Sequence, residues 1–367
     1  MPFYFDPDNY NALLSEKIDN FKGLLTEFDT PELLVYASPN KHFRMRAEFK
    51  MWHDRESKHT SPYPVMFRKD ADKTPVRITN FPIASEAINH VIKALPELLQ
   101  DTEVLKQRLF QMECLSAQNG DTLLTLIYHK PLDEQWTHAA EQLAKTLNVS
   151  IIGRSRKQKV VIGQDHVFDS FTLSNGSILT YKQLENTFTQ PNAAMNTAML
   201  NWVSQHTHGL SGDALELYCG NGNFTVALAK QFKHVFATEV VKTAVKTARE
   251  NFELNKINNA TVIRMSSEEF TQAMNCVRPF RRLKDVDLSA YDFSTILVDP
   301  PRSGLDEQTC AMAQAYQHIV YISCNPDTLC DNLRTLTQTH DIIALAAFDQ
   351  FPYTQHLESG VLLKKRD

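Results

Sequence analysis

The sequence predicts an α/β protein in which a mostly parallel sheet follows a smaller α+β domain. From about residue 181, short apolar runs alternate with helical patterns, as in the strand–helix–strand units of parallel sheets. Before that point the strands alternate apolar and polar residues, which is typical of antiparallel strands with one exposed face. A chain of 367 residues is longer than a single core usually supports. We therefore expect two domains, residues 1–180 and residues 181–367.

Composition narrows the class of protein. Hydrophobic content of 43% and charged content of 22% are ordinary for a globular chain, and a net charge of -5 permits nucleic-acid binding only through a local basic patch. The six cysteines form no Cys-x-x-Cys pair, which argues against zinc, an iron–sulfur cluster and disulfides. The sequence shows neither a signal peptide nor an apolar run near the roughly 18 residues of a membrane span. We expect a cytoplasmic protein without a bound metal and without a membrane partner.

The N-terminal half alternates helical and strand patterns. Helices are predicted over 10–28, 84–99 and 133–147, and a strand over 42–52. One face of that strand is apolar and the other is mostly cationic, with Arg44, Arg46 and Lys50. Aromatic residues that could stack on bases are Phe43, Trp52, Tyr63, Phe67 and Tyr128. These residues predict an RNA-binding surface, and a charged face that only contacts water is the competing explanation.

The first candidate site is a glycine turn in the C-terminal half. A strand over 213–217 runs into Gly220-Asn221-Gly222 and then into a helix, and the next strand ends in Glu239, 19 residues after Gly220. Such an acid accepts hydrogen bonds from ribose hydroxyls. A nicotinamide dinucleotide would favour a third glycine where Thr225 stands, and Glu216 suits a cationic ligand better than a pyrophosphate. The pattern therefore favours S-adenosylmethionine over a dinucleotide.

Two further strands end in chemically distinctive residues. The strand over 294–298 is followed by Asp299-Pro300-Pro301-Arg302, in which the prolines hold the loop open without offering N–H donors to the carboxylate. The strand over 317–323 is followed by Cys324, at the edge where open α/β sheets bind ligands. Taken alone, such a cysteine is more often a small buried residue than a nucleophile. Glu358 starts a final strand that we expect at the edge of the sheet, where it would be an ordinary solvated acid.

A cysteine, an acid and a methyl sulfonium together suggest one reaction. Carbon 5 of uracil is a poor nucleophile, but a thiolate that adds to carbon 6 makes it nucleophilic enough to take a methyl group. A base must then remove the carbon 5 proton so that the thiolate can leave. Because the reaction uses both faces of the base, the nucleotide has to be flipped out of its stack.

At this point the chain resembles the uracil-C5 RNA methyltransferase family, and within it the bacterial branch that modifies the T-loop of tRNA. The resemblance rests on five segments, Gln190-Pro191-Asn192, Glu216–Phe224, Asp299–Gly304, Ser323–Pro326 and His356-Leu357-Glu358. It implies a Rossmann-like S-adenosylmethionine-dependent methyltransferase domain. It also implies that Cys324 is the nucleophile and Glu358 the proton acceptor.

The same resemblance implies the remaining site residues and partners. S-adenosylmethionine would be bound by Gln190, Tyr218, Gly220, Asn223, Glu239 and Asp299, and the flipped nucleotide would be contacted by Phe188 and Arg302. Relatives that act on ribosomal RNA often carry an N-terminal four-cysteine iron–sulfur cluster, whereas Cys114 is the only cysteine before residue 200 here. This absence favours the tRNA branch, with the T-arm of tRNA and also tmRNA as expected partners. We also expect a monomer. Ribosomal RNA as the substrate, and RNA binding or folding with methylation secondary, remain the alternatives.

Overall fold

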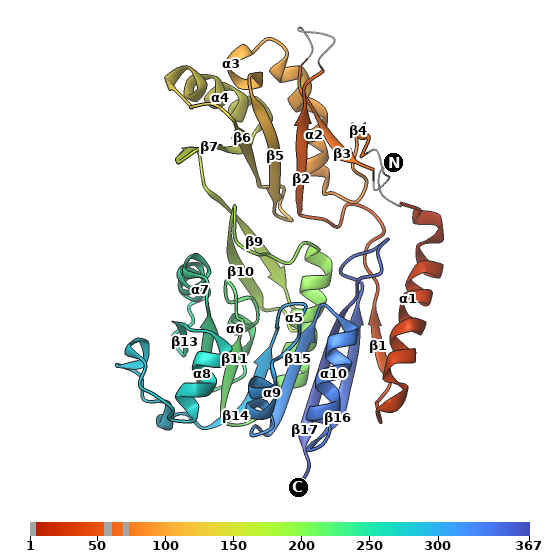
Figure 1. Ribbon diagram of the computed structural model, residues 1–367, viewed down its shortest axis with the longest axis vertical. Coiled ribbons are helices and arrows are strands. Elements are labelled where there is room, and N and C mark those ends of the chain that lie inside the picture. Colours follow the sequence, from red (N-terminus) through yellow and green to blue (C-terminus); the bar gives the residue numbers. More distant parts are fainter. Residues whose placement is uncertain (1–4, 55–60, 69–72) are drawn as a thin grey trace.

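The computed structural model describes residues 5–54, 61–68 and 73–367, and it places a smaller sheet above a larger one (Figure 1). A separate antiparallel hairpin, β9 (His166–Thr172) and β10 (Ile178–Leu184), lies between them. Short 3₁₀ turns occur at Pro7–Asn9, Leu25–Glu27, Arg281–Leu283 and Leu288–Ala290. No helix within the described ranges is both long and apolar enough to cross a membrane.

The smaller sheet has the strand order β4-β3-β2-β5-β6-β7-β8. Its strands are β2 (Arg46–Trp52), β3 (Tyr63–Phe67), β4 (Pro75–Arg77), β5 (Leu109–Ser116), β6 (Thr122–Tyr128), β7 (Ser150–Ser155) and β8 (Gln158–Ile162). The helices α2 (Glu86–Leu99), α3 (Glu103–Lys106) and α4 (Glu134–Leu147) pack with it around one apolar core. Ser85 and Asp133 cap α2 and α4 by accepting hydrogen bonds from the N–H groups of Ile88 and Trp136. The predicted helices over 84–99 and 133–147 are confirmed.

The larger sheet has the strand order β13-β12-β11-β14-β15-β17-β16-β1. Its strands are β1 (Leu33–Tyr36), β11 (Asp213–Leu217), β12 (Val235–Glu239), β13 (Ala260–Arg264), β14 (Phe293–Val298), β15 (His318–Ser323), β16 (His340–Phe348) and β17 (Glu358–Lys365). From β13 to β15 the neighbours are parallel, and chain order reverses between β11 and β14. Open α/β sheets bind their ligands outside the carboxyl ends of the strands at such a reversal.

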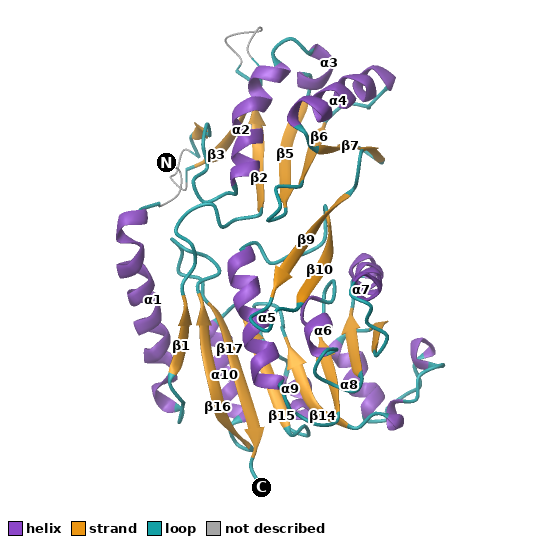
Figure 2. Ribbon diagram, turned by 180° about the vertical axis from the view of Figure 1, so that it is seen from behind, coloured by secondary structure: helices purple, strands orange, loops and turns teal. Residues whose placement is uncertain are grey.

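Helices cover both faces of this sheet (Figure 2). One face packs against α5 (Ala193–Thr207), α6 (Asn223–Leu228) and α7 (Lys242–Leu254). The other packs against α1 (Tyr10–Leu24), α8 (Ser267–Met274), α9 (Glu307–Ala313) and α10 (Pro326–Leu336). Burial on both faces explains why β14 and β15 are continuous apolar runs rather than alternating ones.

The last strand differs from its prediction. We expected it at the edge of the sheet, but β17 is antiparallel and lies between β15 and β16. Val361, Leu362 and Leu363 are all buried, which fits a strand covered on both faces and paired on both sides. This position places Glu358 inside the sheet rather than at its margin.

The described residues 5–40 do not follow the predicted domain boundary at residue 180. α1 buries Ile18 and Phe21 in the core of the larger sheet, and β1 pairs parallel with β16. The backbone of β1 pairs with β16 and so covers the edge that β16 would otherwise expose. The chain therefore starts in the larger sheet before it crosses to the smaller one. The predicted helix over 10–28 is confirmed as α1, but it belongs to the other half of the molecule.

Candidate active site

The carboxyl ends of four neighbouring parallel strands bring most of the predicted site residues together. Cys324 follows β15, Asp299 follows β14, Tyr218 follows β11 and Glu239 ends β12. Because these strands are adjacent and parallel, their carboxyl ends meet at one edge of the sheet.

The turn after β11 has a backbone that favours glycine. Gly220 has φ 56° and Gly222 has φ 84°, and a Cβ on Gly222 would lie 2.9 Å from Cε1 of Phe252. No described atom lies within 4 Å of a Cβ built on Gly220, so the backbone there stays open to a ligand. Tyr218 is held at φ 63°, a strained conformation for an aromatic residue, and its hydroxyl donates to Oγ of Ser267 over 2.7 Å.

Short-range hydrogen bonds hold this turn in place. Oε2 of Glu239 accepts from the N–H of Gly220 at 3.0 Å, and Oε1 accepts from the N–H of Val241 at 2.7 Å. Asn223 exchanges two amide hydrogen bonds with Asn196 of α5, at 2.9 and 3.1 Å. Sequence analysis missed Asn196, whose only signal is a polar residue on the buried face of a helix.

One pocket joins six of the predicted residues, which are Phe188, Gln190, Tyr218, Gly220, Asn223 and Asp299. Behind it lies Glu216, which is fully buried, and its two carboxylate oxygens have no hydrogen-bond partner among the described residues. Burial, with a smaller contribution from Asp299 and Glu239, raises the pKa of Glu216 to about 8, and burial raises the pKa of Asp299 to about 7. An uncompensated group of carboxyls favours a positively charged ligand.

The pairing of β15 with β17 brings Cys324 and Glu358 together. Ser323 lies opposite Ser359, so Cys324 and Glu358 are the next facing positions in the same register. Burial, together with the carboxyls of Glu358 and Asp299, raises the pKa of the Cys324 thiol to about 11. Glu358 is 3% exposed, and burial together with Asp299 raises its pKa well above the usual range. The structure therefore places a thiol and a buried acid side by side at the carboxyl end of β15.

Beside Cys324 lies a cavity of about 250 Å³, lined by Lys17, Arg302, Cys324 and His356 among others. Asn325 forms the turn between β15 and α10, because its side chain accepts from the N–H of Asp327 at 3.3 Å and donates to the carbonyl of Arg302 at 3.0 Å. Nη2 of Arg302 lies 3.1 Å from Nδ1 of His356. Sequence analysis did not predict Lys17 or His356 as part of this cavity.

The basic residues of β2 do not form the open cationic row that we expected. Nε of Arg44 donates to the carbonyl of Arg46 at 2.8 Å. Arg46 donates to the carbonyls of Leu184, Glu185 and Thr187, just before Phe188. The ammonium of Lys50 lies 4.0 Å from the centre of the Phe110 ring and donates to Gln111. Bonds to internal carbonyls compensate for the partial burial of these charges, so Arg46 also links β2 to the segment before Phe188, and its contact with RNA stays a prediction.

The predicted aromatic residues divide into two groups. Phe43 and Tyr128 are buried in the protein and cannot stack on a base, whereas Trp52 and Phe67 are exposed and contact each other edge-on at 6.4 Å. Tyr63 is half-buried, and the guanidinium of Arg77 lies 4.5 Å from the centre of its ring. Phe188 is 69% exposed at the mouth of the pocket. It also lines a second cavity of about 340 Å³ together with Arg44 and Arg46. Phe188 therefore connects the smaller sheet with the site on the larger one.

The strand order, the glycine turn and the acid that ends β12 define a Rossmann-like methyltransferase fold. The crystal structure of Pyrococcus abyssi tRNA (uracil-54, C5)-methyltransferase in complex with S-adenosyl-L-homocysteine has the same fold. It matches with a TM-score of 0.73 and 20% identity over 97% of this chain and 83% of that one. Within the described ranges, no group of three or more His, Cys, Asp or Glu side chains is arranged to hold a metal ion.

Sequence comparison is more specific. The model of the tRNA (Uracil-5-)-methyltransferase family matches residues 9–366. A tRNA/tmRNA (uracil-C(5))-methyltransferase of Cellvibrio japonicus is 53% identical over 97% of this chain and 96% of its own length. Its counterpart from Aggregatibacter aphrophilus is 51% identical over 98% of both chains. The chain belongs to the tRNA (uracil-5-)-methyltransferase family.

Proposed function

We propose that this enzyme uses S-adenosylmethionine to methylate carbon 5 of the T-loop uridine in tRNA, and that it also acts on tmRNA. The observation that carries the proposal is the facing of Cys324 and Glu358 across β15 and β17, beside a cofactor turn built for close backbone approach. Two of the most similar relatives are named for this activity on both RNAs, and they cover nearly the whole chain.

The residues around the glycine turn fit S-adenosylmethionine. Its ribose would be held by Glu239, and its remaining groups by Gln190, Tyr218, Asn223 and Asp299 around the open backbone of Gly220. The unpaired carboxyl of Glu216 behind the pocket, and a lining without Lys or Arg among the described residues, support a positively charged ligand there. The cofactor supplies a methyl group on a positively charged sulfonium.

The two residues at the edge of the sheet divide the remaining chemistry. The Cys324 thiolate would add to carbon 6 of the uracil, and the electron pair released at carbon 5 would form the bond to the methyl group, while the sulfonium sulfur keeps the electrons of its broken bond and leaves as a neutral thioether. Glu358, as a carboxylate, then takes the proton from carbon 5, and the electrons of that C–H bond expel the thiolate. Glu358 is buried, whereas Cys324 is half-buried and lines a cavity, so its thiol can be reached by a base.

We further propose that the enzyme is a monomer in the cytoplasm. Cys324, Glu358 and the glycine turn come from one chain, so one copy forms a whole site and we propose a monomer. A reducing cytoplasm would keep the Cys324 thiol free to react. The cavity that runs from Arg44 and Arg46 to Phe188 offers the T-arm a path toward the site.

The test is methylation of an unmodified tRNA transcript with methyl-labelled S-adenosylmethionine, followed by nucleoside digestion. We expect label in 5-methyluridine and none when the T-loop uridine is replaced by cytidine. A ribosomal RNA fragment serves as the competing substrate. Label that appears only on the ribosomal fragment, or no 5-methyluridine on any RNA, would contradict the proposal.

A further inference from the structure

The loop over residues 349–357 connects β16 to β17 and ends at the proposed base. Phe348 and Glu358 face each other at its two ends. We propose that α1 acts as a clamp on this loop, and that Lys17 is a positioning residue which holds Glu358 in its reactive place. The inference deepens the proposed methylation and rests on it.

Among the described residues, the hydrogen-bond partners of the Lys17 ammonium all belong to this loop. It is 7% exposed, and its ammonium lies 2.5 Å from Oδ1 of Asp349, which is 1% exposed. It also donates to the carbonyl of Phe351 at 3.2 Å and to that of His356 at 3.0 Å. One ammonium therefore ties the first residue of the loop to a residue two positions before Glu358.

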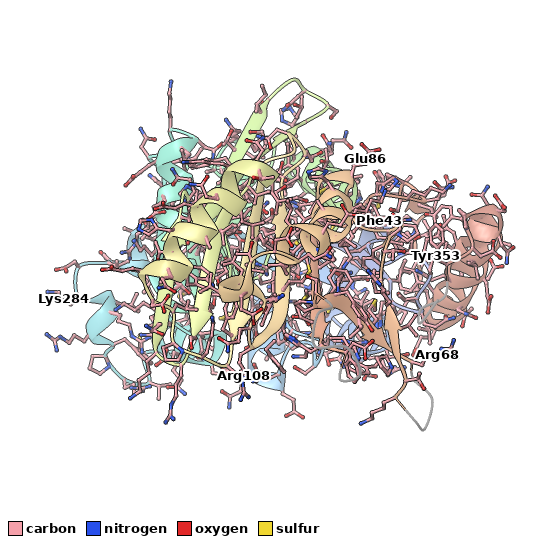
Figure 3. All side chains as sticks on the ribbon, turned by 90° about the horizontal axis from the view of Figure 1, so that it is seen from above. Phe43, Arg68, Glu86, Arg108, Lys284 and Tyr353 are labelled. Atoms are coloured by element: carbon pink, nitrogen blue, oxygen red, sulfur yellow. The ribbon has the colours of Figure 1, made fainter. Side chains whose placement is uncertain are left out.

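Tyr10 completes the clamp. Its hydroxyl donates to Oδ2 of Asp349 at 2.9 Å and accepts from the N–H of Ser38 at 2.8 Å. Its ring also lies 5.9 Å from the ring of Tyr353. Viewed from above, Tyr353 lies on the side of the molecule where α1 runs (Figure 3). Both oxygens of Asp349 are thus bonded by residues of α1.

The clamped loop carries more than the base. Nε2 of Gln350, which is fully buried, donates to Oε1 of Gln190 in the cofactor pocket at 2.6 Å. His356 contacts Arg302 at the mouth of the Cys324 cavity. A shift of the loop would therefore move Glu358, Arg302 and Gln190 together.

A direct role of Lys17 in binding RNA fits the contacts less well. An ammonium has three N–H donors, and Lys17 uses them on one carboxylate and two carbonyls. It is also buried, whereas a phosphate contact needs an exposed cation. Its place in the lining of the Cys324 cavity follows from its hold on the loop.

The experiment compares wild type, Lys17→Met, Asp349→Asn and the double variant on T-arm RNA. A misplacement of about 1 Å costs roughly 100-fold in rate, so we expect Lys17→Met to lower kcat by about 10- to 100-fold. KM for RNA should change less than about threefold. A covalent RNA–enzyme adduct should accumulate on ordinary RNA, because removal of the carbon 5 proton becomes the slow step. Lys22→Met is the matched control, since Lys22 is exposed on the same helix.

The double variant separates positioning from stability. Lys17→Met leaves a buried unpaired carboxylate, and Asp349→Asn added to it removes that charge. A clamp predicts that the double variant regains thermal stability but stays as slow as the slower single variant. Lys17→Met with the kcat of wild type, or a double variant that regains both stability and kcat, would overturn the clamp. A wild type that makes no 5-methyluridine contradicts the proposed function instead.

Discussion

The two sides of the site are held together in different ways. On the cofactor side, hydrogen bonds between residues at most 27 positions apart in the sequence fix Gly220, Glu239 and Asn223. One example is the 3.0 Å bond from the N–H of Gly220 to Glu239. On the nucleotide side, Cys324 and Glu358 meet only because β17 inserts between β15 and β16 and because Lys17 reaches Asp349. The first side is a local motif, and the second is assembled by the tertiary structure.

The largest effect is expected on the nucleotide side. Glu358→Gln keeps the shape of the side chain but removes the base, so turnover should fall by about 10²- to 10⁴-fold. A covalent adduct with ordinary tRNA should accumulate, which denaturing gel electrophoresis with labelled RNA would detect. Glu253→Gln, an exposed acid on α7, is the control. A Glu358→Gln enzyme that turns over rapidly and carries no adduct would exclude Glu358 as the base.

The pH dependence of kcat/KM tests the nucleotide side of the site further. Cys324 must lose its proton to react, and its pKa is raised to about 11 by burial and by the neighbouring carboxyls. Glu358 must also be ionised, and its pKa is raised as well. Each of these two ionisations raises kcat/KM for RNA by up to about tenfold per pH unit below its pKa, so kcat/KM should rise throughout pH 7 to 9. A rate that falls over this range, with cofactor affinity measured in parallel, would contradict these protonation states.

The cofactor side should respond in affinity rather than in chemistry. Glu239→Gln weakens a charged acceptor that both orders the turn and faces the ribose, so we expect S-adenosylhomocysteine to bind about 10- to 100-fold more weakly. Calorimetry measures this directly. Adduct formation at saturating cofactor should stay near wild type. Unchanged binding of S-adenosylhomocysteine would contradict a role of Glu239 in binding the ribose. The two hydrogen bonds of its carboxylate would then only order the turn in the absence of cofactor.

The smallest effect is expected on the free energy of unfolding of the cofactor-free protein, through Glu216. The pKa of Glu216 is raised to about 8 in the folded protein, so the folded state binds the proton more tightly than the unfolded chain. Its contribution is fully present below about pH 4.5 and is lost as pH rises through about 8. Glu216→Gln should therefore be more resistant to urea than wild type at pH 8.5, with a smaller difference at pH 6. Parallel pH profiles for the two proteins would contradict the raised pKa.

The same division explains what the sequence could predict. The glycine turn, Glu239 and the Asp299 loop follow their strands directly, so local pattern was enough to place them on one edge. The position of β17 was predicted wrongly, because a terminal apolar strand looks the same whether it lies at an edge or inside the sheet. Lys17 and Asp349 are separated by 332 residues, and no local pattern links them. Arg46 looked like a surface charge because alternation in β2 cannot show that its outer face meets another part of the chain.

The central claim is that Cys324 forms a covalent bond to the uracil beside Glu358. The most direct test gives the enzyme T-arm RNA with 5-fluorouridine at the T-loop position, together with S-adenosylmethionine, because fluorine at carbon 5 cannot be removed as a proton. We predict a stable adduct that peptide mass spectrometry maps to Cys324. It should be absent in Cys324→Ala and unchanged in Cys276→Ala, which alters an exposed cysteine. An adduct on another cysteine, or full methyl transfer to ordinary tRNA by Cys324→Ala, would contradict the account.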